Sequence, residues 1–283
     1  MSVFSELFRY FRISLRVGLK DSSKVSNSNI YVSLTTTPDR IGKIKDTLNS
    51  LLDQNTQAQA IILNLPRVSL KGVEYSIPSF LKNNTNVTIN WIPEDLGPAS
   101  KSLPTLRNPD IPSDALIVVL DDDQVYPKNL LELYLQSSQL YPDHALTICG
   151  WKVPKSLQHQ EKKILRGAGL KLAEPKANIS EDSQVEVLQG ASSYAIKKSF
   201  FDNQIFDFSV APINAMFADD IWLSGHLAKR KVPRKLIKGS FSYCRILAYP
   251  HFKTEGLRDT ANADNSNNDA LYRYFENDWQ LFD

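Results

Sequence analysis

The chain has 283 residues, a length that suits one large α/β domain or two small ones. Hydrophobic residues make up 42% of it and aromatic residues 10%, which excludes a chain too polar to bury a core. The net charge of +2 is too small for a nucleic-acid binder of basic composition, so we expect no nucleic-acid partner.

Residues 1–20 form the first predicted element, a basic amphipathic helix. Its apolar residues recur at spacings of three and four: Phe4, Leu7, Phe8, Phe11 and Leu15. Four basic residues against one glutamate give this segment a charge of +3, and its arginines argue against a cleaved signal peptide. Such a helix either lies on an anionic membrane surface or packs on its own domain or a second subunit, and both interpretations stay open. The small polar residues of segment 21–29 predict a linker.

Four short apolar runs follow and predict buried strands: Ile30–Leu34, Ala60–Leu65, Val87–Trp91 and Ala115–Leu120. Between the first two, residues 41–52 show a helical pattern. Continuous apolar strands that alternate with helices indicate a parallel sheet covered on both faces. In such sheets ligands gather at the carboxyl ends of the strands. The segments at those ends are polar or turn-forming: 35–40, 64–67, 93–101 and 121–124.

The second half of the chain is less regular, and its patterns predict shorter elements. We expect helices over Leu130–Leu140 and Phe217–Lys229 and strands over Ala145–Cys149 and Val185–Leu188. Residues 259–283 carry six acids and one arginine, a net charge of −5, and predict an acidic C-terminal helix. The simplest organisation is one domain over residues 30–258 with a long irregular second half.

Asp121, Asp122 and Asp123 follow the fourth apolar run without a gap. Three adjacent carboxylates repel one another, and a divalent cation removes that cost. Mg²⁺ and Mn²⁺ prefer oxygen ligands and are commonly held by one or two carboxylates together with substrate phosphates. Because alternate residues of an extended segment point the same way, we expect Asp121 and Asp123 to share the metal face and Asp122 to point elsewhere. The alternative is a solvated acidic turn before Pro127.

Three features resemble the GT-A fold glycosyltransferases, and most closely the family 2-like enzymes of bacterial and viral glycan synthesis. They are the strand that ends in three aspartates, the aspartate pair at 219–220 and the Thr-rich first loop, within roughly residues 30–252. The resemblance implies a Rossmann-like, mostly parallel sheet flanked by helices. It also implies that an Asp-x-Asp motif, here Asp121 and Asp123, holds Mn²⁺ or Mg²⁺ and the donor diphosphate, with Asp122 at the ribose or the sugar.

By the same resemblance, two further segments supply the nucleotide side of the site. The residues implied to bind the donor are Thr35, Thr36, Thr37, Arg40, Asp95 and Lys101. Hydroxyls and a guanidinium at strand ends suit a base, a ribose or a phosphate. The alternatives are a turn or helix cap for the threonines and an ordinary surface residue for the lysine.

In the second half, segment 188–198 resembles the glycine-containing loop that closes over the sugar, and Gly190 lets backbone approach a ligand closely. Asp219 and Asp220 open a predicted helix, where a cap explains one aspartate and leaves the other for chemistry. The resemblance to inverting enzymes implies that Asp220 is the general base and that Asp219 binds near the acceptor. The base would take the proton of an acceptor hydroxyl while the metal stabilises the departing diphosphate.

Several other residues each have two possible roles. Trp222 either stacks on an acceptor sugar or packs in the core. His251 resembles the histidine that completes the metal site in many GT-A enzymes, and imidazole suits Mn²⁺; the alternative is a packed or surface histidine. Lys253 and Arg258 either close over the diphosphate as a lid or are solvated.

The expected function is transfer of a sugar from a nucleotide-diphosphate sugar, with UDP favoured, to a hydroxyl of a glycan or glycolipid. Cys149 and Cys244 lie beside apolar runs and indicate buried thiols in a reducing compartment, so we expect a cytoplasmic protein with peripheral contact to the inner face of a membrane. One alternative is a metal-dependent nucleotidyltransferase or phosphohydrolase, although the first strand is not followed by a glycine-rich phosphate motif. The other is a non-catalytic sugar-binding relative.

Overall fold

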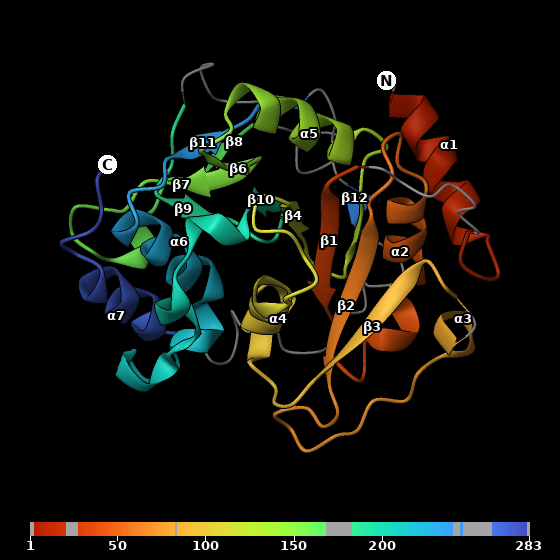
Figure 1. The fold of residues 1–283 in the computed structure, drawn as a ribbon, viewed down its shortest axis with the longest axis horizontal. Coiled ribbons are helices and arrows are strands. Elements are labelled where there is room, and N and C mark those ends of the chain that lie inside the picture. Colours follow the sequence, from red (N-terminus) through yellow and green to blue (C-terminus); the bar gives the residue numbers. More distant parts are fainter. Residues whose placement is uncertain are drawn as a thin grey trace.

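The computed structural model describes residues 3–20, 28–82, 84–167, 183–239, 244–245 and 262–281 (Figure 1). The strands there are β1 (Ile30–Thr35), β2 (Ala60–Pro66), β3 (Val87–Ile92), β4 (Leu116–Val119), β5 (Gln124–Val125), β6 (Ala145–Thr147), β7 (Cys149–Trp151), β8 (Leu165–Arg166), β9 (Val187–Leu188), β10 (Tyr194–Ile196), β11 (Arg234–Leu236) and β12 (Cys244–Arg245). The helices are α1 (Val3–Ser14), α2 (Lys45–Leu52), α3 (Ser79–Lys82), α4 (Leu103–Arg107), α5 (Leu130–Leu140), α6 (Asp219–Lys229) and α7 (Ser266–Tyr274).

Among these described elements, seven strands form the central sheet in the order β11-β6-β10-β4-β1-β2-β3. The strands β1 to β4 pair in parallel, and so do β6 and β11. Only β10 runs antiparallel to both of its neighbours, β4 and β6. The predicted α/β class, a mostly parallel sheet flanked by helices, is confirmed.

Both faces of the sheet are buried at its inner strands β1, β2 and β4, which explains why these read as continuous apolar runs. Val32 of β1 and Val118 of β4 face a core that includes α2 and α5. Ile117 and Val119 of β4 face a second core, formed with α4, α6 and α7. The side chains of β4 therefore alternate between two apolar environments, whereas the edge strand β3 has Thr88 and Trp91 exposed.

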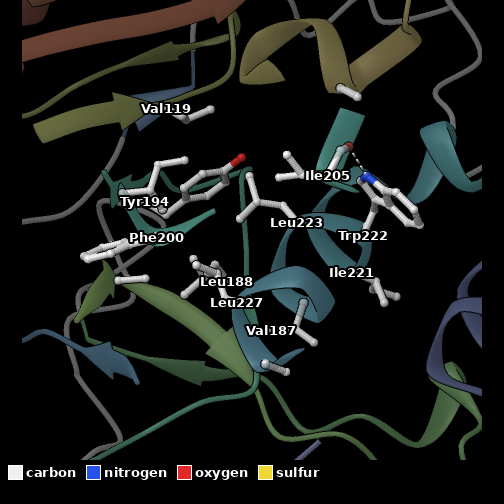
Figure 2. Close-up of a cluster of buried hydrophobic side chains, with 14 of the residues drawn as sticks. Val119, Val187, Leu188, Tyr194, Phe200, Ile205, Ile221, Trp222, Leu223 and Leu227 are labelled. Carbon is white, nitrogen blue, oxygen red and sulfur yellow. Dashed lines mark hydrogen bonds between the residues drawn. The ribbon is translucent and has the colours of Figure 1, made fainter. Parts of the chain in front are cut away.

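Trp222 lies in the second of these cores. Its position decides between the two interpretations of this residue, stacking on an acceptor sugar and packing in the core. The indole is 1% exposed, stacks on Phe208 at 5.0 Å between ring centroids, and donates a hydrogen bond from Nε1 to the carbonyl of Ile205. Figure 2 shows it beside Leu223, with Tyr194 and Val119 farther along the same cluster. Trp222 is a core residue and not a stacking surface for a sugar.

The predicted single strand over residues 145–149 is wrong. The chain forms two short strands there, β6 in the central sheet and β7 in a three-stranded sheet with β8 and β9. The change of sheet is possible because Gly150 lets the backbones of β7 and β9 approach closely: a Cβ on Gly150 would lie 2.3 Å from the carbonyl oxygen of Val187.

The direction of β10 decides which loop reaches the carboxyl ends of the parallel strands. Tyr194, the first residue of β10, pairs with Val119, the last residue of β4. The residues before β10, and not those after it, therefore lie beside the aspartates that follow β4. This places the segment around Gly190 at the edge where ligands are expected.

Both terminal segments contain a helix among their described residues. The first helix, Val3–Ser14, packs on α2, and its residues Arg9, Tyr10 and Ile13 are buried, which is one of the two arrangements expected. Within described residues 262–281, Ser266–Tyr274 form a helix. Among the described residues, no helix is both long enough and apolar enough to cross a membrane.

Candidate active site

A cavity of about 1460 Å³ opens at the carboxyl ends of β1 and β4. It is lined by these predicted site residues: Thr35, Thr36, Thr37, Arg40, Asp95, Lys101, Asp121, Asp122, Asp123, Asp219 and Asp220. Gly190 lies between two further lining residues, Gln189 and Ala191. His251, Lys253 and Arg258 fall outside the described residues. The fold thus gathers predicted site residues from position 35 to position 220 around one cavity, whose lining extends to Asn268.

The side chains of the three aspartates do not point as strand alternation predicted, with Asp121 and Asp123 on one face and Asp122 on the other. The strand β4 ends at Val119, and residues 122 and 123 lie in a turn, so the alternation rule does not reach them. Asp121 turns toward Lys101, with 3.2 Å between Oδ1 and Nζ. Asp122 and Asp123 both approach Nη2 of Arg40, at 2.5 and 3.5 Å. The turn therefore separates Asp121 from the other two.

Asp122 ties this turn to the first loop. It is 6% exposed, and its carboxylate accepts hydrogen bonds from the Thr36 hydroxyl and the Arg40 guanidinium. Burial raises the pKa of Asp122 to about 7, although the charge of Arg40 and the bond from Thr36 oppose the rise. The backbone oxygen of Asp122 also accepts from the Thr47 hydroxyl of α2 at 2.7 Å. In this structure Asp122, Thr36 and Arg40 hold one another in place at the cavity wall.

Lys101 joins the two sides of the cavity. Its Nζ lies 3.2 Å from Asp121 Oδ1, 3.0 Å from Asp219 Oδ2 and 3.7 Å from Asp220 Oδ1. Burial by itself lowers the pKa of this lysine, but the three carboxylates outweigh it, so the pKa lies well above its ordinary value. The side chain ends between the aspartate that follows β4 and the pair that opens α6.

The two carboxylate oxygens of Asp220 have different surroundings. Its Oδ2 accepts a hydrogen bond from the backbone N–H of Gly190 at 3.0 Å. Its Oδ1 is buried, makes no hydrogen bond among the described residues and lies 3.7 Å from Nζ of Lys101. Burial raises the pKa of Asp220 to about 7, with the charge of Lys101 opposing the rise. Burial also raises the pKa of Asp219. A carboxylate with a pKa near neutrality can exchange a proton efficiently at physiological pH.

Gly190 is required by close packing. A Cβ at this position would lie 2.4 Å from Nζ of Lys101 and 2.7 Å from Oδ1 of Asp220. Both distances are shorter than any van der Waals contact, so a side chain would displace one or both groups. From the sequence we expected Gly190 to let the backbone approach a ligand. In the structure its closest neighbours are the side chains of Lys101 and Asp220.

Three other residues predicted to bind the nucleotide-sugar donor make hydrogen bonds with nearby backbone or side-chain groups. Asp95 accepts the N–H of Gly97 and the N–H of Leu70, each at 2.8 Å, and so joins two loops at the rim of the cavity. Thr35 donates its hydroxyl to the carbonyl of residue 64, and Thr37 donates to Asp39. All three line the cavity, and their present bonds shape its rim.

Two tyrosines that support the site were missed in the sequence. The hydroxyl of Tyr126 accepts from the N–H of Asp121 at 3.0 Å and donates to its carbonyl at 2.9 Å, which fixes the backbone at the head of the aspartate turn. The hydroxyl of Tyr75 donates to the carbonyl of Thr36 at 2.8 Å. Tyr126 stands only three residues after Asp123, a spacing that signals a supporting role. Tyr75 has no such local signal, because its loop reaches the site only through the fold.

The residues present fit a divalent cation in part. The side chains of Asp121 and Asp123 are 30% and 20% exposed and line the cavity, so their carboxylates are within reach of a ligand. Two carboxylates with diphosphate oxygens and water make a donor set that suits Mg²⁺ or Mn²⁺. Within the described part of the chain, no group of three or more His, Cys, Asp or Glu side chains is arranged to hold a metal ion. His251, the third predicted ligand, lies outside that part.

Solved structures with a similar course of the chain include a glycosyltransferase. It is the mannosyltransferase PcManGT from Pyrobaculum calidifontis in complex with GDP-Man and Mn²⁺, which matches with a TM-score of 0.45 and 14% identity over 90% of this chain and 68% of that one. TarS 1-349 from S. aureus matches with a TM-score of 0.41 and 13% identity over 75% of this chain and 59% of that one. No protein-family model matches the sequence, and no curated protein matches it. Likenesses this distant carry no weight in assigning a function.

Proposed function

We propose that the chain is a metal-dependent glycosyltransferase that moves a sugar from a nucleotide-diphosphate sugar to an acceptor hydroxyl with inversion. UDP is the favoured nucleotide, and the acceptor is a glycan or a glycolipid. The observation that carries the proposal is the meeting of two acidic groups in one cavity. Asp121 after β4 and the pair Asp219–Asp220 at the start of α6 both contact Lys101.

The donor side of the proposed site is the wall formed by the first loop and the aspartate turn. Asp121 and Asp123 would hold Mn²⁺ or Mg²⁺, with His251 as a third ligand, and Arg40 would face the phosphates. When bound, the metal would supply positive charge for the departing diphosphate. Asp122 and Thr36 keep Arg40 oriented for that contact through the hydrogen bonds they already make.

The acceptor side is the wall formed by α6 and the loop before β10. Asp220 is the proposed general base, because its Oδ1 accepts no hydrogen bond among the described residues while the Gly190 N–H holds its other oxygen. It would take the proton of the acceptor hydroxyl as that oxygen attacks the anomeric carbon, so no covalent enzyme intermediate is needed. Asp219 shares Lys101 with Asp220 and would position the acceptor.

Lys101 has a different proposed role from the one its sequence context implies. The resemblance places it at the nucleotide, whereas its Nζ lies between the two acidic groups. It reduces the repulsion between carboxylates that a donor diphosphate would increase. We therefore assign it to positioning Asp121 relative to Asp219 and Asp220.

The test uses the purified full chain and a panel of UDP-, GDP-, CMP- and dTDP-sugars, scored for Mn²⁺-dependent hydrolysis and for a shift in melting temperature. Asp123→Ala is expected to remove both the metal-dependent stabilisation and turnover. Asp220→Asn is expected to keep the stabilisation and to lower turnover about 100-fold or more, the usual contribution of a general base. Asp110→Asn, an exposed aspartate before the opposite end of β4, is the matched control.

Absence of stabilisation by every nucleotide in Mn²⁺ and in Mg²⁺ would overturn the proposal. Cleavage of nucleoside triphosphates or phosphomonoesters without sugar transfer would favour the nucleotidyltransferase or phosphohydrolase alternative. Nucleotide-sugar binding without turnover by the unmodified chain, in the presence of candidate acceptors, would favour a non-catalytic sugar-binding protein. Full turnover by Asp220→Asn would remove Asp220 as the base while leaving the donor site intact.

A further inference from the structure

The first helix packs with a charged residue inward and with apolar residues outward. Arg9 is 5% exposed, and its guanidinium donates to Asp53 Oδ2 at 2.9 Å, to the carbonyl of Tyr126 at 2.9 Å and to the carbonyl of Ser50 at 3.1 Å. Tyr10 and Ile13 are buried beside it. The helix therefore buries Arg9 together with two apolar residues, and the apolar row expected from the sequence is not the face that packs on the domain.

The apolar stripe of the helix is left on the outside. Phe8 is 74% exposed, Phe11 52% and Leu15 82%. Phe8 and Phe11 lie three residues apart on one face of α1, and Leu15, the first residue past its end, follows Phe11 through a hydrogen bond from its N–H to the Phe11 carbonyl. Val17, just beyond the helix, is 95% exposed and extends the stripe. Single exposed apolar residues are ordinary, but a contiguous row of large ones marks a surface that meets an apolar partner. This row is not needed for the core, because the inner face is already filled.

The charge around the stripe indicates which partner fits. Asp53 faces three cations: Arg9 and Arg12 at 2.9 and 3.2 Å from Oδ2, and Lys20 at 2.8 Å from Oδ1. One carboxylate thus meets three positive charges, and Arg16, four residues after Arg12 in the sequence, is a further exposed cation of this segment. Apolar side chains flanked by excess positive charge suit an anionic lipid surface. A second copy of the chain fits less well, because a symmetric contact would bring the same arginines together.

We propose that the outer face of α1 docks the protein on an anionic phospholipid bilayer, with Phe8, Phe11 and Leu15 among the acyl chains and Arg12 and Arg16 against lipid phosphates. This inference deepens the membrane contact expected of residues 1–20 by naming the face that makes it. It holds whether or not the chain transfers a sugar, so its test needs neither a donor nor turnover.

The same helix also supports the candidate active site. Arg9 binds the carbonyl of Tyr126, and the Tyr126 hydroxyl holds the backbone of Asp121. Deleting residues 1–20 would therefore disturb the aspartate turn together with any membrane contact. Substitutions on the outer face avoid this difficulty, because those side chains contribute little to the packing of the helix.

The experiment is sedimentation of the full chain with vesicles of phosphatidylglycerol and phosphatidylcholine, compared with phosphatidylcholine alone, at low and high salt. We expect binding to the anionic vesicles that weakens with salt, as screening requires. The triple variant Phe8→Ser, Phe11→Ser, Leu15→Ser should lower the partition coefficient by about tenfold or more. Its matched control is Leu140→Ser, Val210→Ser, Ile213→Ser, which changes three exposed apolar residues outside α1 and should bind as the unmodified chain does.

Both triple variants should melt within a few degrees of the unmodified protein, which separates lost docking from lost folding. The proposal is overturned if the unmodified chain does not bind anionic vesicles, or if the α1 variant binds them as well as its control does. It is also overturned if the unmodified chain is a dimer that the α1 variant alone converts to a monomer without any binding to vesicles, since the stripe would then serve a second copy. Loss of transferase activity with intact vesicle binding would bear on the proposed function and not on this surface.

Discussion

Lys101→Met removes the buried cation that faces three carboxylates, and it tests the electrostatics of the site without assuming a substrate. Nζ lies 3.0, 3.2 and 3.7 Å from the nearest oxygens of Asp219, Asp121 and Asp220. At an effective dielectric constant of about 20, each pair attracts by roughly 5 kcal/mol before desolvation is subtracted. Removing one partner of a buried ion pair costs about 3 to 5 kcal/mol. We expect a loss near 3 kcal/mol, because water screens the partly exposed Asp121.

The loss should depend on pH in a defined direction. Burial raises the pKa of Asp220 to about 7 with Lys101 present, and loss of the lysine would raise it further. As pH rises from about 6 to about 9, the folded variant keeps a proton that the unmodified protein has released, so its stability falls more steeply. The deficit in free energy of unfolding should therefore be larger at pH 9 than at pH 6.

The assay is urea unfolding at both pH values with EDTA present, so that no divalent cation replaces the missing charge. Lys229→Met is the matched control, because Lys229 is an exposed lysine of the helix that carries Asp219 and Asp220. The control should change the free energy of unfolding by less than about 0.5 kcal/mol. A deficit below about 1 kcal/mol for Lys101→Met at pH 9, or equal deficits at the two pH values, would refute the reasoning.

Three further predictions concern single groups. Gly190→Ala should lower turnover about 100-fold by displacing Lys101 and Asp220 and should cost about 1 to 3 kcal/mol of unfolding free energy; steady-state kinetics with normal values would contradict this. If Asp220 is the base, kcat should rise with pH through about 7 as its carboxylate loses a proton, and Asp220→Asn should flatten that profile; a fall in kcat over the same range would count against it. Arg9→Met should lower the free energy of unfolding by about 2 to 4 kcal/mol, whereas Arg16→Met, on the exposed side, should leave it nearly unchanged in the same urea titration.

The sheet could be predicted from the sequence where strands are buried on both faces. The runs that begin at Ile30, Ala60 and Val87 became β1, β2 and β3 with ends within one residue of those expected. Burial on two sides explains the runs of β1 and β2, whereas β3 is an edge strand with Thr88 and Trp91 exposed. The strand β10 was not expected, because Tyr194–Ile196 is short and follows a loop of small residues. Its position between β4 and β6 depends on pairing that no local pattern records.

The candidate site could be predicted as a set of residues but not as a set of contacts. The aspartates, the first loop and the pair at 219–220 do line one cavity. The meeting of Lys101 with Asp219 was not predictable, because their separation in sequence gives no sign of their distance in space. The buried face of α1, with Arg9, Tyr10 and Ile13, was not predictable either. Apolar residues at helical spacing show that a helix has unlike faces, and only the surrounding packing decides which one is buried.

The place of β10 in the sheet has a consequence for how the chain folds as it is made. Strands β4 and β6 are complete by residue 147, yet their shared neighbour, Tyr194–Ile196, is synthesised about 50 residues later. Until then each of them presents an unpaired edge, which is a template for pairing with other chains. Insertion of β10 closes the edges of β4 and β6 that face each other and brings the segment around Gly190 to the aspartate turn. The sheet and the acidic cluster are completed later still, because β11 and the pair Asp219–Asp220 follow β10 in the chain. A chain interrupted before β10 would therefore lack the site and would be prone to aggregate.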